Sequence, residues 1–306
     1  QANAVDFAHY SERLVLVADD NAVNREVIIE TLRRFDLPCD TVVDGRAAIE
    51  AVKAKRYDLV FMDGSMPDID GFEATIKIRE WERETGRAAL PIVALTAHVV
   101  GAHADAWKHA GMNGVLHKPF TMQAMADTLK SWLVESDRKA SPAAVMAPVI
   151  AGPAAIIAPE IAPLPPAPRP AVEDEGDTPI LEPGVTRQML DMARMGGKDA
   201  VARIYQLYLE NGPPALAEID AALAAGDSPR LGKAAHALKS MSLSLGAQRV
   251  AAGASELEKA ARGEVSKLYP GLRETIATEI EIAYRRIGTL MADEGLNASK
   301  AEASAA

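Results

Sequence analysis

The fold of the amino-terminal half is decided by the stretch Tyr57-Asp-Leu-Val-Phe-Met-Asp63-Gly-Ser-Met-Pro67-Asp-Ile-Asp-Gly71. Its apolar run, residues 59–62, is typical of a parallel strand that is buried on both faces. Pro67 and Gly71 then break the chain before the next helix. A carboxylate at the carboxyl end of such a strand lies where open α/β sheets form their ligand sites. Asp63 by itself would equally suit a surface turn, because Asp-Gly is common turn chemistry.

Two more carboxylates favour a ligand site at Asp63 over a simple surface turn. Asp19 and Asp20 follow the first apolar strand, residues 14–18. Because the carboxyl ends of neighbouring parallel strands meet at one edge of a sheet, we expect both to lie beside Asp63. Three ionised carboxylates in one crevice repel each other unless a cation neutralises them. A hard divalent ion with oxygen ligands, above all Mg²⁺, meets that need.

Two further strands end on polar side chains. Residues 91–95 are followed by Thr96, and residues 115–117 are followed by Lys118. Together with the acid pair, these groups suit phosphoryl transfer to Asp63, because a metal ion, an ammonium group and a hydroxyl all stabilise the charge on the equatorial oxygens.

Four motifs summarise this pattern: Asp19-Asp20-Asn21-x-x-Asn24-Arg25, Met62-Asp63-x-x-Met66-Pro67-x-x-x-Gly71, Ala94-Leu95-Thr96-Ala97 and Lys118-Pro119-Phe120. Through them, residues 13–135 resemble the receiver domain of two-component response regulators, most of all the receivers attached to hybrid histidine kinases. The resemblance implies that Asp63 is the phospho-acceptor and that Thr96 and Lys118 bind the phosphoryl group. It also implies the ligands of Mg²⁺, which are Asp20 directly, Asp19 through water, Asp63 and the backbone carbonyl of Ser65.

One position departs from the family pattern. Receivers usually carry Tyr or Phe three residues before the lysine, and here that position is Val115. In the family the aromatic side chain swings inward as the threonine engages the phosphoryl group. A receiver that only relays phosphate does not need this movement.

Composition sets limits on the class of protein. The chain has 306 residues, a net charge of −10 and one cysteine, Cys39. The acidic balance argues against binding to nucleic acid or to anionic membranes, because no basic excess exists to neutralise phosphates. The single cysteine fits a reducing compartment, and no run reaches the length of a membrane-spanning helix. We expect a cytoplasmic protein, or the cytoplasmic end of a membrane-bound sensor kinase.

The strand–helix alternation up to residue 135 predicts a five-stranded, doubly wound parallel sheet. Ahead of it, residues 1–12 read as the remnant of a linker, and the start at Gln1 suggests a piece of a longer chain. Residues 136–180 are rich in Ala and Pro, which predicts a flexible, semi-extended linker. A proline-rich docking ligand is the alternative for this segment. The end, residues 294–306, reads as a disordered tail.

Residues 181–293 have a helical pattern without strand-like alternation. Short connections with glycine stop signals predict an antiparallel bundle. The helices expected are residues 185–195, 199–211, 213–225, 229–245, 247–262 and 267–290.

One of these helices carries a candidate nucleophile. On residues 229–245 the positions at helical spacing that form the core stripe are Leu231, Ala235, Leu238, Ser242 and Leu245. His236 falls on the other side, which it shares with Gly232, Lys233, Lys239, Ser240 and Leu243. We therefore expect His236 to point to solvent. Lysines three residues before and after it would keep the imidazole neutral and would offset the oxygens of a phosphoryl group attached to it.

The stretch Ala235-His236-x-Leu238-Lys239-Ser240, followed by Leu245-Gly246-Ala247, Leu257-Glu258 and Arg262, resembles the histidine-phosphotransfer (HPt) domain. Together, the two resemblances imply a phosphorelay. A histidine kinase, in cis or in trans, would phosphorylate Asp63, the receiver would contact the bundle and pass the group to His236, and a downstream response regulator would take it from there.

The chain shows no ATP-binding kinase domain, so it reads as the carboxy-terminal part of a hybrid histidine kinase. A hydrolase with an aspartyl-phosphate intermediate is disfavoured, because Ser65 stands where its second aspartate would be. A scaffold module that regulates a kinase without being phosphorylated is the alternative.

Overall fold

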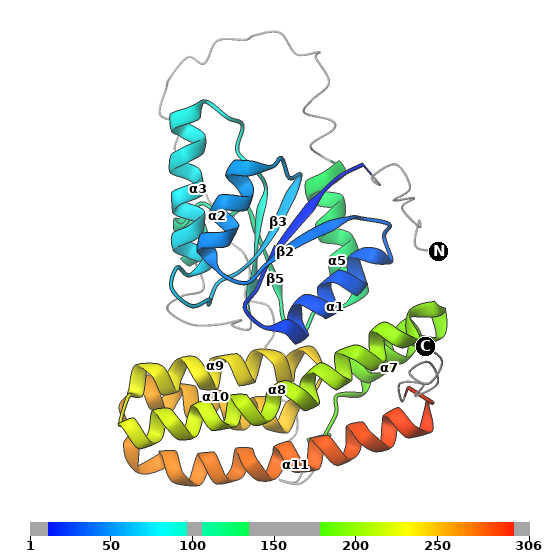
Figure 1. The fold of residues 1–306 in the computed structure, drawn as a ribbon, viewed down its shortest axis with the longest axis vertical. Helices are drawn as coiled ribbons and strands as arrows, with labels where there is room; N and C mark the ends of the chain where they lie inside the picture. The colour runs from blue at the N-terminus through cyan, green and yellow to red at the C-terminus, as the bar shows by residue number, and fades with distance from the viewer. Residues whose placement is uncertain (1–11, 97–105, 135–177, 297–306) are drawn as a thin grey trace, which may run out of the picture.

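The computed structural model describes residues 12–96, 106–134 and 178–296. Residues 12–96 and 106–134 form an α/β unit, and residues 178–296 form a helical unit that lies directly against it (Figure 1). The linker predicted over residues 136–180 lies mostly outside the described residues, so its boundaries stay predictions. Among the described helices, none is both long and apolar enough to cross a bilayer.

The α/β unit is built on a five-stranded sheet of parallel strands in the order β2-β1-β3-β4-β5. This confirms the predicted doubly wound sheet. The strands are β1 (Val15–Ala18), β2 (Cys39–Val42), β3 (Leu59–Asp63), β4 (Ile92–Thr96) and β5 (Gly114–His117). Ala18 pairs with Met62, and Asp63 pairs with Leu95. This register brings the residues that follow β1 to the same edge as Asp63.

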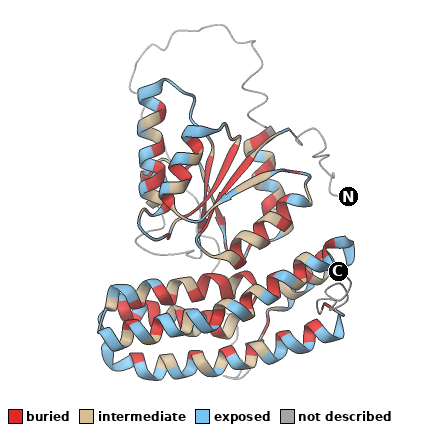
Figure 2. Ribbon diagram, in the orientation of Figure 1, coloured by how far each residue is buried: buried red, intermediate tan, exposed pale blue. Residues whose placement is uncertain are grey.

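Helices cover both faces of the sheet. They are α1 (Ala22–Arg33), α2 (Gly45–Ala54), α3 (Gly71–Thr85), α4 (Ala106–His109) and α5 (Met122–Leu129), which continues as the π-helical turn η2 (Lys130–Val134). Helices α1 and α5 lie on one face and α2 and α3 on the other (Figure 1). Since both faces are covered, every residue of β1 and β3 is buried (Figure 2). This burial explains the unbroken apolar runs in the sequence.

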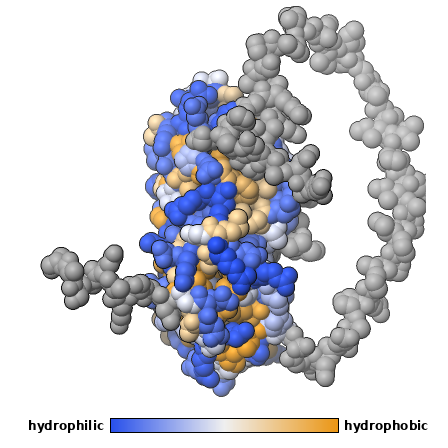
Figure 3. Space-filling model, turned by 90° about the vertical axis from the view of Figure 1, so that its right-hand side faces the viewer, coloured by the Kyte–Doolittle hydropathy of each residue, from blue (hydrophilic) through white to orange (hydrophobic). Residues whose placement is uncertain are grey.

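The helical unit confirms the predicted all-helical bundle. It contains α7 (Pro183–Met192), the turn η3 (Ala193–Gly197), α8 (Lys198–Ala225), α9 (Ser228–Ser244), α10 (Gln248–Arg262), the 3₁₀ turn η4 (Ser266–Leu268) and α11 (Tyr269–Asp293). On the face drawn in Figure 3, hydrophilic side chains surround smaller apolar patches, as suits a chain in which a quarter of the residues are charged.

One helix boundary was predicted wrongly. The sequence suggested a break before Pro213, but α8 continues through Pro213 and Pro214. Proline removes a backbone donor and clashes with the preceding turn, so tertiary packing must hold the helix together here. At the preceding residue, Gly212, a Cβ atom would lie only 1.6 Å from the hydroxyl oxygen of Tyr284 on α11. The glycine therefore lets α11 approach closely, and this contact supports α8 where its own hydrogen bonds are interrupted.

We expect Gly212→Ala to destabilise the helical unit. The added methyl group would have to displace the ring of Tyr284, and overpacking of this kind costs about 1–3 kcal/mol. Denaturant melts of the full chain followed by circular dichroism will measure the change, with Gly271→Ala as the control. Gly271 is also helical, and a Cβ atom there would meet nothing within 4 Å. Equal stability of the two variants would contradict the packing argument.

The two units share an apolar core. Helix α1 lies across α8 and α9 (Figure 1). One cluster of buried side chains runs from the sheet face beneath α1 and α5 into the centre of the bundle. The edge of the sheet that carries Asp63 is thereby placed against α9.

Candidate functional site

The three carboxylates predicted to cluster do so. Oxygen atoms of Asp19, Asp20 and Asp63 all lie within 4.8 Å of one another. Asp19 and Asp63 are buried, at 0% and 4% exposed, while Asp20 reaches the surface. Burial raises the pKa of Asp19 to about 7, with a contribution from the charge of Asp63 and an opposing one from Lys118. Burial and the charge of Asp63 also raise the pKa of Asp20. The cluster therefore favours any cation that can reach it.

Lys118 partly neutralises this cluster. Its Nζ donates to Asp19 Oδ2 at 2.7 Å and to Asp63 Oδ2 at 2.8 Å. Burial alone would lower the pKa of the Lys118 ammonium, but the two carboxylates outweigh burial and raise it. The peptide bond between Lys118 and Pro119 is cis. Three carboxylates against one ammonium still leave a negative balance at this edge.

Asp63 is positioned by the loop that follows β3. The backbone N–H of Ser65 donates to Asp63 Oδ1 at 3.2 Å. The loop folds back so tightly that a Cβ atom at Gly71 would lie 1.9 Å from the Asp63 carbonyl oxygen. Thr96 and Val115 line a cavity of about 570 Å³ together with Asp63. Ala97 of the threonine motif lies outside the described residues, as does the neighbouring His98.

The start of α1 holds Asp19 in place. Asn24 Nδ2 donates to Asp19 Oδ1 at 3.1 Å, and the backbone N–H of Asn21 donates to the same oxygen at 2.9 Å. Arg25 Nη1 donates to the Asp19 carbonyl at 2.7 Å. The Asn21 side chain also caps α1 by accepting from the N–H groups of residues 23 and 24. Asn21, Asn24 and Arg25, which the sequence showed only as parts of a motif, therefore hold Asp19 in place by hydrogen bonds.

Repulsion among the three clustered carboxylates should lower the stability of the chain when no metal ion is bound. We expect Asp63→Asn to raise the melting temperature of the metal-free chain, because it removes one of the repelling charges. The same change should reduce the stabilisation that Mg²⁺ gives. Thermal melts of wild-type and variant chains, with EDTA and with Mg²⁺, will measure both effects, with the exposed Asp68→Asn as a control. A lower melting temperature for Asp63→Asn in EDTA would count against repulsion as the dominant effect.

His236 lies on α9, whose core stripe is as predicted: Leu231, Ala235, Leu238, Ser242 and Leu245 are all buried. The expected solvent exposure of the opposite face was wrong in part. Lys239 and Ser240 are only 5% and 3% exposed, and the His236 side chain is 14% exposed. Packing of α10 and of the α/β unit covers this face, which no periodicity within one helix can reveal. Lys233 is exposed, as expected.

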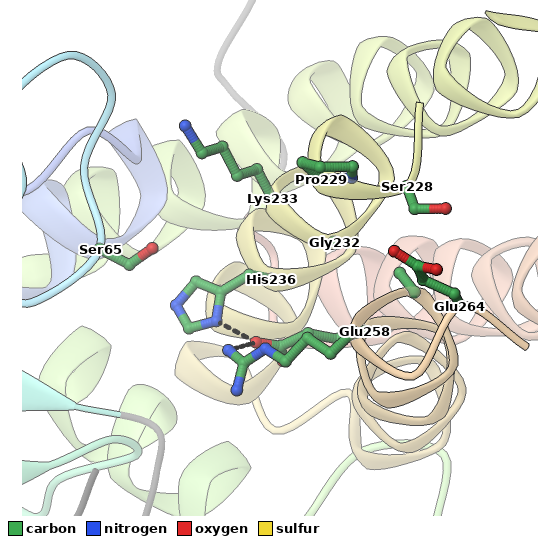
Figure 4. Close-up of a pocket in the computed structure, with 10 residues that line it drawn as sticks. Ser65, Ser228, Pro229, Gly232, Lys233, His236, Glu258 and Glu264 are labelled. Carbon is green, nitrogen blue, oxygen red and sulfur yellow. Dashed lines mark hydrogen bonds and ion pairs between the residues drawn. The ribbon is translucent and has the colours of Figure 1, made fainter. Parts of the chain in front are cut away.

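Glu258 on α10 is the partner that sequence reasoning missed. His236 Nδ1 lies 3.0 Å from Glu258 Oε1 (Figure 4). Lys239 Nζ donates to Glu258 Oε2 at 2.6 Å. Burial alone would raise the pKa of Glu258, but hydrogen bonds and charge from His236 and Lys239 lower it to about 2. Glu258 is therefore an ionised acceptor, which assigns the proton to Nδ1 and leaves the lone pair on Nε2. Lys239 contacts Glu258 and so acts on His236 indirectly.

Comparison with known proteins identifies the family of each unit. The model of the response regulator receiver domain matches residues 15–130, and the model of the Hpt domain matches residues 203–287. The chain is a receiver domain followed by a histidine-phosphotransfer domain. This arrangement is that of a two-component phosphorelay module.

The relatives are much longer proteins. The sensor protein GacS of Pseudomonas syringae pv. syringae is 37% identical over 128 residues, which cover 42% of this chain and 14% of GacS. Hybrid signal transduction histidine kinase E of Dictyostelium discoideum is 38% identical over 121 residues, covering 39% of this chain and 7% of that protein. The chain therefore spans a small part of the length of these relatives.

Solved structures with matching segments include a receiver domain of a Pseudomonas aeruginosa sensor histidine kinase, with magnesium in its active-site cleft. It is 34% identical, with a TM-score of 0.37, and the match covers 40% of this chain and 98% of that one. Another is the Saccharomyces cerevisiae complex of the phosphotransfer protein Ypd1 with the receiver of Ssk1. Its match is 27% identical with a TM-score of 0.39, and covers 40% of this chain and 90% of that one.

The receiver and the HPt domain meet around Asp63 and His236. The cavity that holds Asp63 and Thr96 is also lined by Lys233, His236 and Arg262 of the HPt domain. A second cavity, of about 320 Å³, places Ser65 of the receiver across from the His236 ring (Figure 4). Asp63 and His236 therefore face one shared space.

Buried hydrogen bonds join the two domains beside this space. Ser240 Oγ accepts from Asn24 Nδ2 at 2.9 Å and from Lys118 Nζ at 3.3 Å. Ser244 Oγ donates to Asn24 Oδ1 at 2.7 Å. Asn24 thus connects the support of Asp19 to α9, and an HPt hydroxyl contacts the lysine of the receiver site.

Proposed function

We propose that a phosphoryl group passes between Asp63 and His236 within this chain. A histidine kinase would supply it to Asp63, and a receiver on a downstream response regulator would take it from His236. The observation that carries the proposal is the shared cavity lined by Asp63 and His236. We further propose that the chain is the carboxy-terminal part of a cytoplasmic hybrid histidine kinase, which its similarity to part of GacS supports.

We propose that transfer within this cavity is direct, without an intermediate carrier. Nε2 of His236 attacks the phosphorus of the acyl phosphate, so that a P–N bond forms while the P–O bond to Asp63 breaks. The electron pair of the broken bond stays on the Asp63 carboxylate, whose negative charge the Lys118 ammonium stabilises through its hydrogen bond to Oδ2 at 2.8 Å. The imidazole gains positive charge and keeps its proton on Nδ1, where Glu258 stabilises that charge. No proton has to leave for transfer to proceed.

Mg²⁺ fits the acidic edge. Its ligands would be Asp19, Asp20, Asp63 and the backbone carbonyl of Ser65. Carboxylate oxygens are the ligands that Mg²⁺ prefers, and the three side chains converge within 4.8 Å. Bound there, Mg²⁺ would stabilise charge on the phosphoryl oxygens. Thr96 lines the same cavity and is the proposed hydrogen-bond donor to that group.

The roles of the lysines around His236 differ. Lys233 is exposed and lines the shared cavity, so it can approach the phosphoryl oxygens. Lys239 is held by Glu258 and sets the charge around the histidine instead. A non-phosphorylated scaffold would need none of these contacts around the reactive nitrogen.

The direct test supplies the full chain with acetyl phosphate and Mg²⁺ and maps phosphorylated residues by mass spectrometry under conditions that preserve acyl phosphates and phosphohistidine. We expect modification at Asp63 and at His236. A chain that remains unmodified at both positions, while a known receiver is labelled in parallel, would favour the scaffold function.

A further inference from the structure

The receiver also contacts the HPt domain away from the reactive residues, at the turn between α7 and α8. Residues 192–197 form this turn, which we call the socket. We propose that the socket binds a cationic side chain at the carboxyl end of a receiver's first helix, and that it selects which receivers the HPt domain accepts. Arg34 occupies it in this chain. The proposal rests on the phosphorelay function proposed above.

The socket offers backbone carbonyls to a guanidinium group. Arg34 Nη1 donates to the carbonyl of Met195 at 3.1 Å, and Nη2 donates to the carbonyl of Met192. Carbonyl groups at the carboxyl end of a helix carry partial negative charge, and each carbonyl oxygen has a second lone pair that can accept a further hydrogen bond. A cation with N–H donors can therefore both hydrogen-bond to these carbonyls and offset their charge. An acidic side chain would be repelled by the same carbonyls.

Arg34 is already held in the orientation that the socket requires. Its Nε lies 3.4 Å from Glu30 Oε1, one turn earlier on α1. The side chain of Glu30 is 4% exposed and that of Arg34 is 14% exposed. Because the ion pair fixes the arginine within α1, little conformational freedom remains to be lost on docking.

Glycine gives the arginine room. A Cβ atom at position 197 would lie 2.5 Å from Arg34 Nη2 and 2.7 Å from Glu30 Oε1. Gly196 has a φ of +95°, which turns the chain so that the carbonyls are presented. In the sequence these glycines were only helix stop signals. The close approach assigns Gly197 to recognition of the receiver.

The socket is separate from the chemistry. Arg34 lies ten residues after Asn24, which is about 15 Å along a helix axis. Asn24 contacts Ser240 beside the reactive residues, and Glu26, nearer to Asn24 than to Arg34, lies 3.4 Å from Arg203 of α8. Docking at the socket can therefore change without altering the groups that transfer phosphate.

This placement has a consequence for the relay. The receiver of this chain covers His236 while Arg34 is in the socket, so a downstream receiver must displace it. A competitor is expected to carry Arg or Lys at the end of its own first helix. The strength of the Arg34 contact then controls how often His236 is open to that competitor.

The test uses two full-length chains and transfer between them. The donor carries His236→Gln and is phosphorylated at Asp63 with acetyl phosphate and Mg²⁺, then separated from the reagent. The acceptor carries Asp63→Asn, and label on its His236 is followed over time at low concentration. We expect Arg34→Glu in the donor to slow transfer and Arg34→Glu in the acceptor to accelerate it, each on the order of tenfold.

The opposite signs separate docking from a structural role. If Arg34→Glu slows transfer in the acceptor as well as in the donor, the proposal is overturned. The matched control is Arg33→Glu: that side chain is 68% exposed and pairs with Glu30 within α1. If Arg34→Glu behaves like Arg33→Glu in both chains, the socket does not select receivers. In an acceptor with Gly197→Ala, the difference between donors with Arg34 and with Arg34→Glu should disappear.

A second measurement does not need transfer. Arg34→Glu should increase the radius of gyration of the full chain in small-angle X-ray scattering, since it loosens the contact between the domains, whereas Arg33→Glu should leave it unchanged. If no label ever reaches His236, the proposed function fails. The scattering measurement then tests the docking contact by itself. An unchanged radius of gyration for Arg34→Glu would show that Arg34 does not hold the two domains together.

Discussion

In a chain that carries His236→Gln, phosphate supplied to the receiver is expected to remain at Asp63, and the label on the HPt domain is expected to be lost completely. In the Asp63→Asn chain the HPt label should also disappear when acetyl phosphate is the source. Both results are expected because His236 and Asp63 line one cavity, so that phosphate on Asp63 is the source of the label on His236. Acid and base stability of the label, together with mass spectrometry, distinguishes phosphohistidine from acyl phosphate.

Two controls make this result specific. Gln248→Ala, at a half-buried position of the same domain, should leave both labels intact. Melting curves should show that His236→Gln and Asp63→Asn remain folded. Label that persists on the HPt domain of the Asp63→Asn chain would show that phosphate reaches His236 independently of the receiver.

The second large effect concerns Glu258, the partner of His236. We expect Glu258→Gln to slow transfer from Asp63 to His236 by on the order of a hundredfold or more. The carboxylate keeps the proton on Nδ1 and offsets the positive charge that develops on the ring, and removing the equivalent group in catalytic triads has a large effect on rate. Rapid quenching of a phosphorylated full chain, followed by quantification of both phosphoresidues, gives the rate.

Phosphorylation of Asp63 itself should be unchanged in Glu258→Gln, because Glu258 bonds to His236, Lys239 and Arg262, which all belong to the HPt domain. Glu256→Gln is the matched control. Glu256 lies on the same helix but is exposed, and it pairs with Lys259 instead. Transfer at the wild-type rate in Glu258→Gln would show that the carboxylate does not assist His236.

Much of the receiver site could be predicted from the sequence because parallel strands impose their own geometry. The apolar runs before Asp19 and Asp63 identify buried strands, and the carboxyl ends of such strands meet at one edge. The cluster of three carboxylates followed from this rule alone. The core stripe of α9 was equally predictable, because helical periodicity assigns Leu231 and Leu238 to the same side.

Helical periodicity could not predict which side chains from other elements pack against Lys239 and Ser240. Lys239 is buried because Glu258, nineteen residues later on another helix, accepts its hydrogen bond. Ser240 is buried because Asn24, from the other domain, donates to it. Such contacts join positions that no local pattern links, so the sequence suggested exposure for both side chains.

Local pattern and motifs were enough to predict the two domain types and the residues at the strand ends, and to propose His236 as the phosphotransfer residue. Only the tertiary structure decided that α8 passes through Pro213, that Glu258 orients His236, and that Arg34 enters the turn at Gly197. Each of these results depends on a side chain brought in from a distant part of the chain. Packing energy of that kind outweighs local propensity, and it becomes visible only when the fold places the partners together.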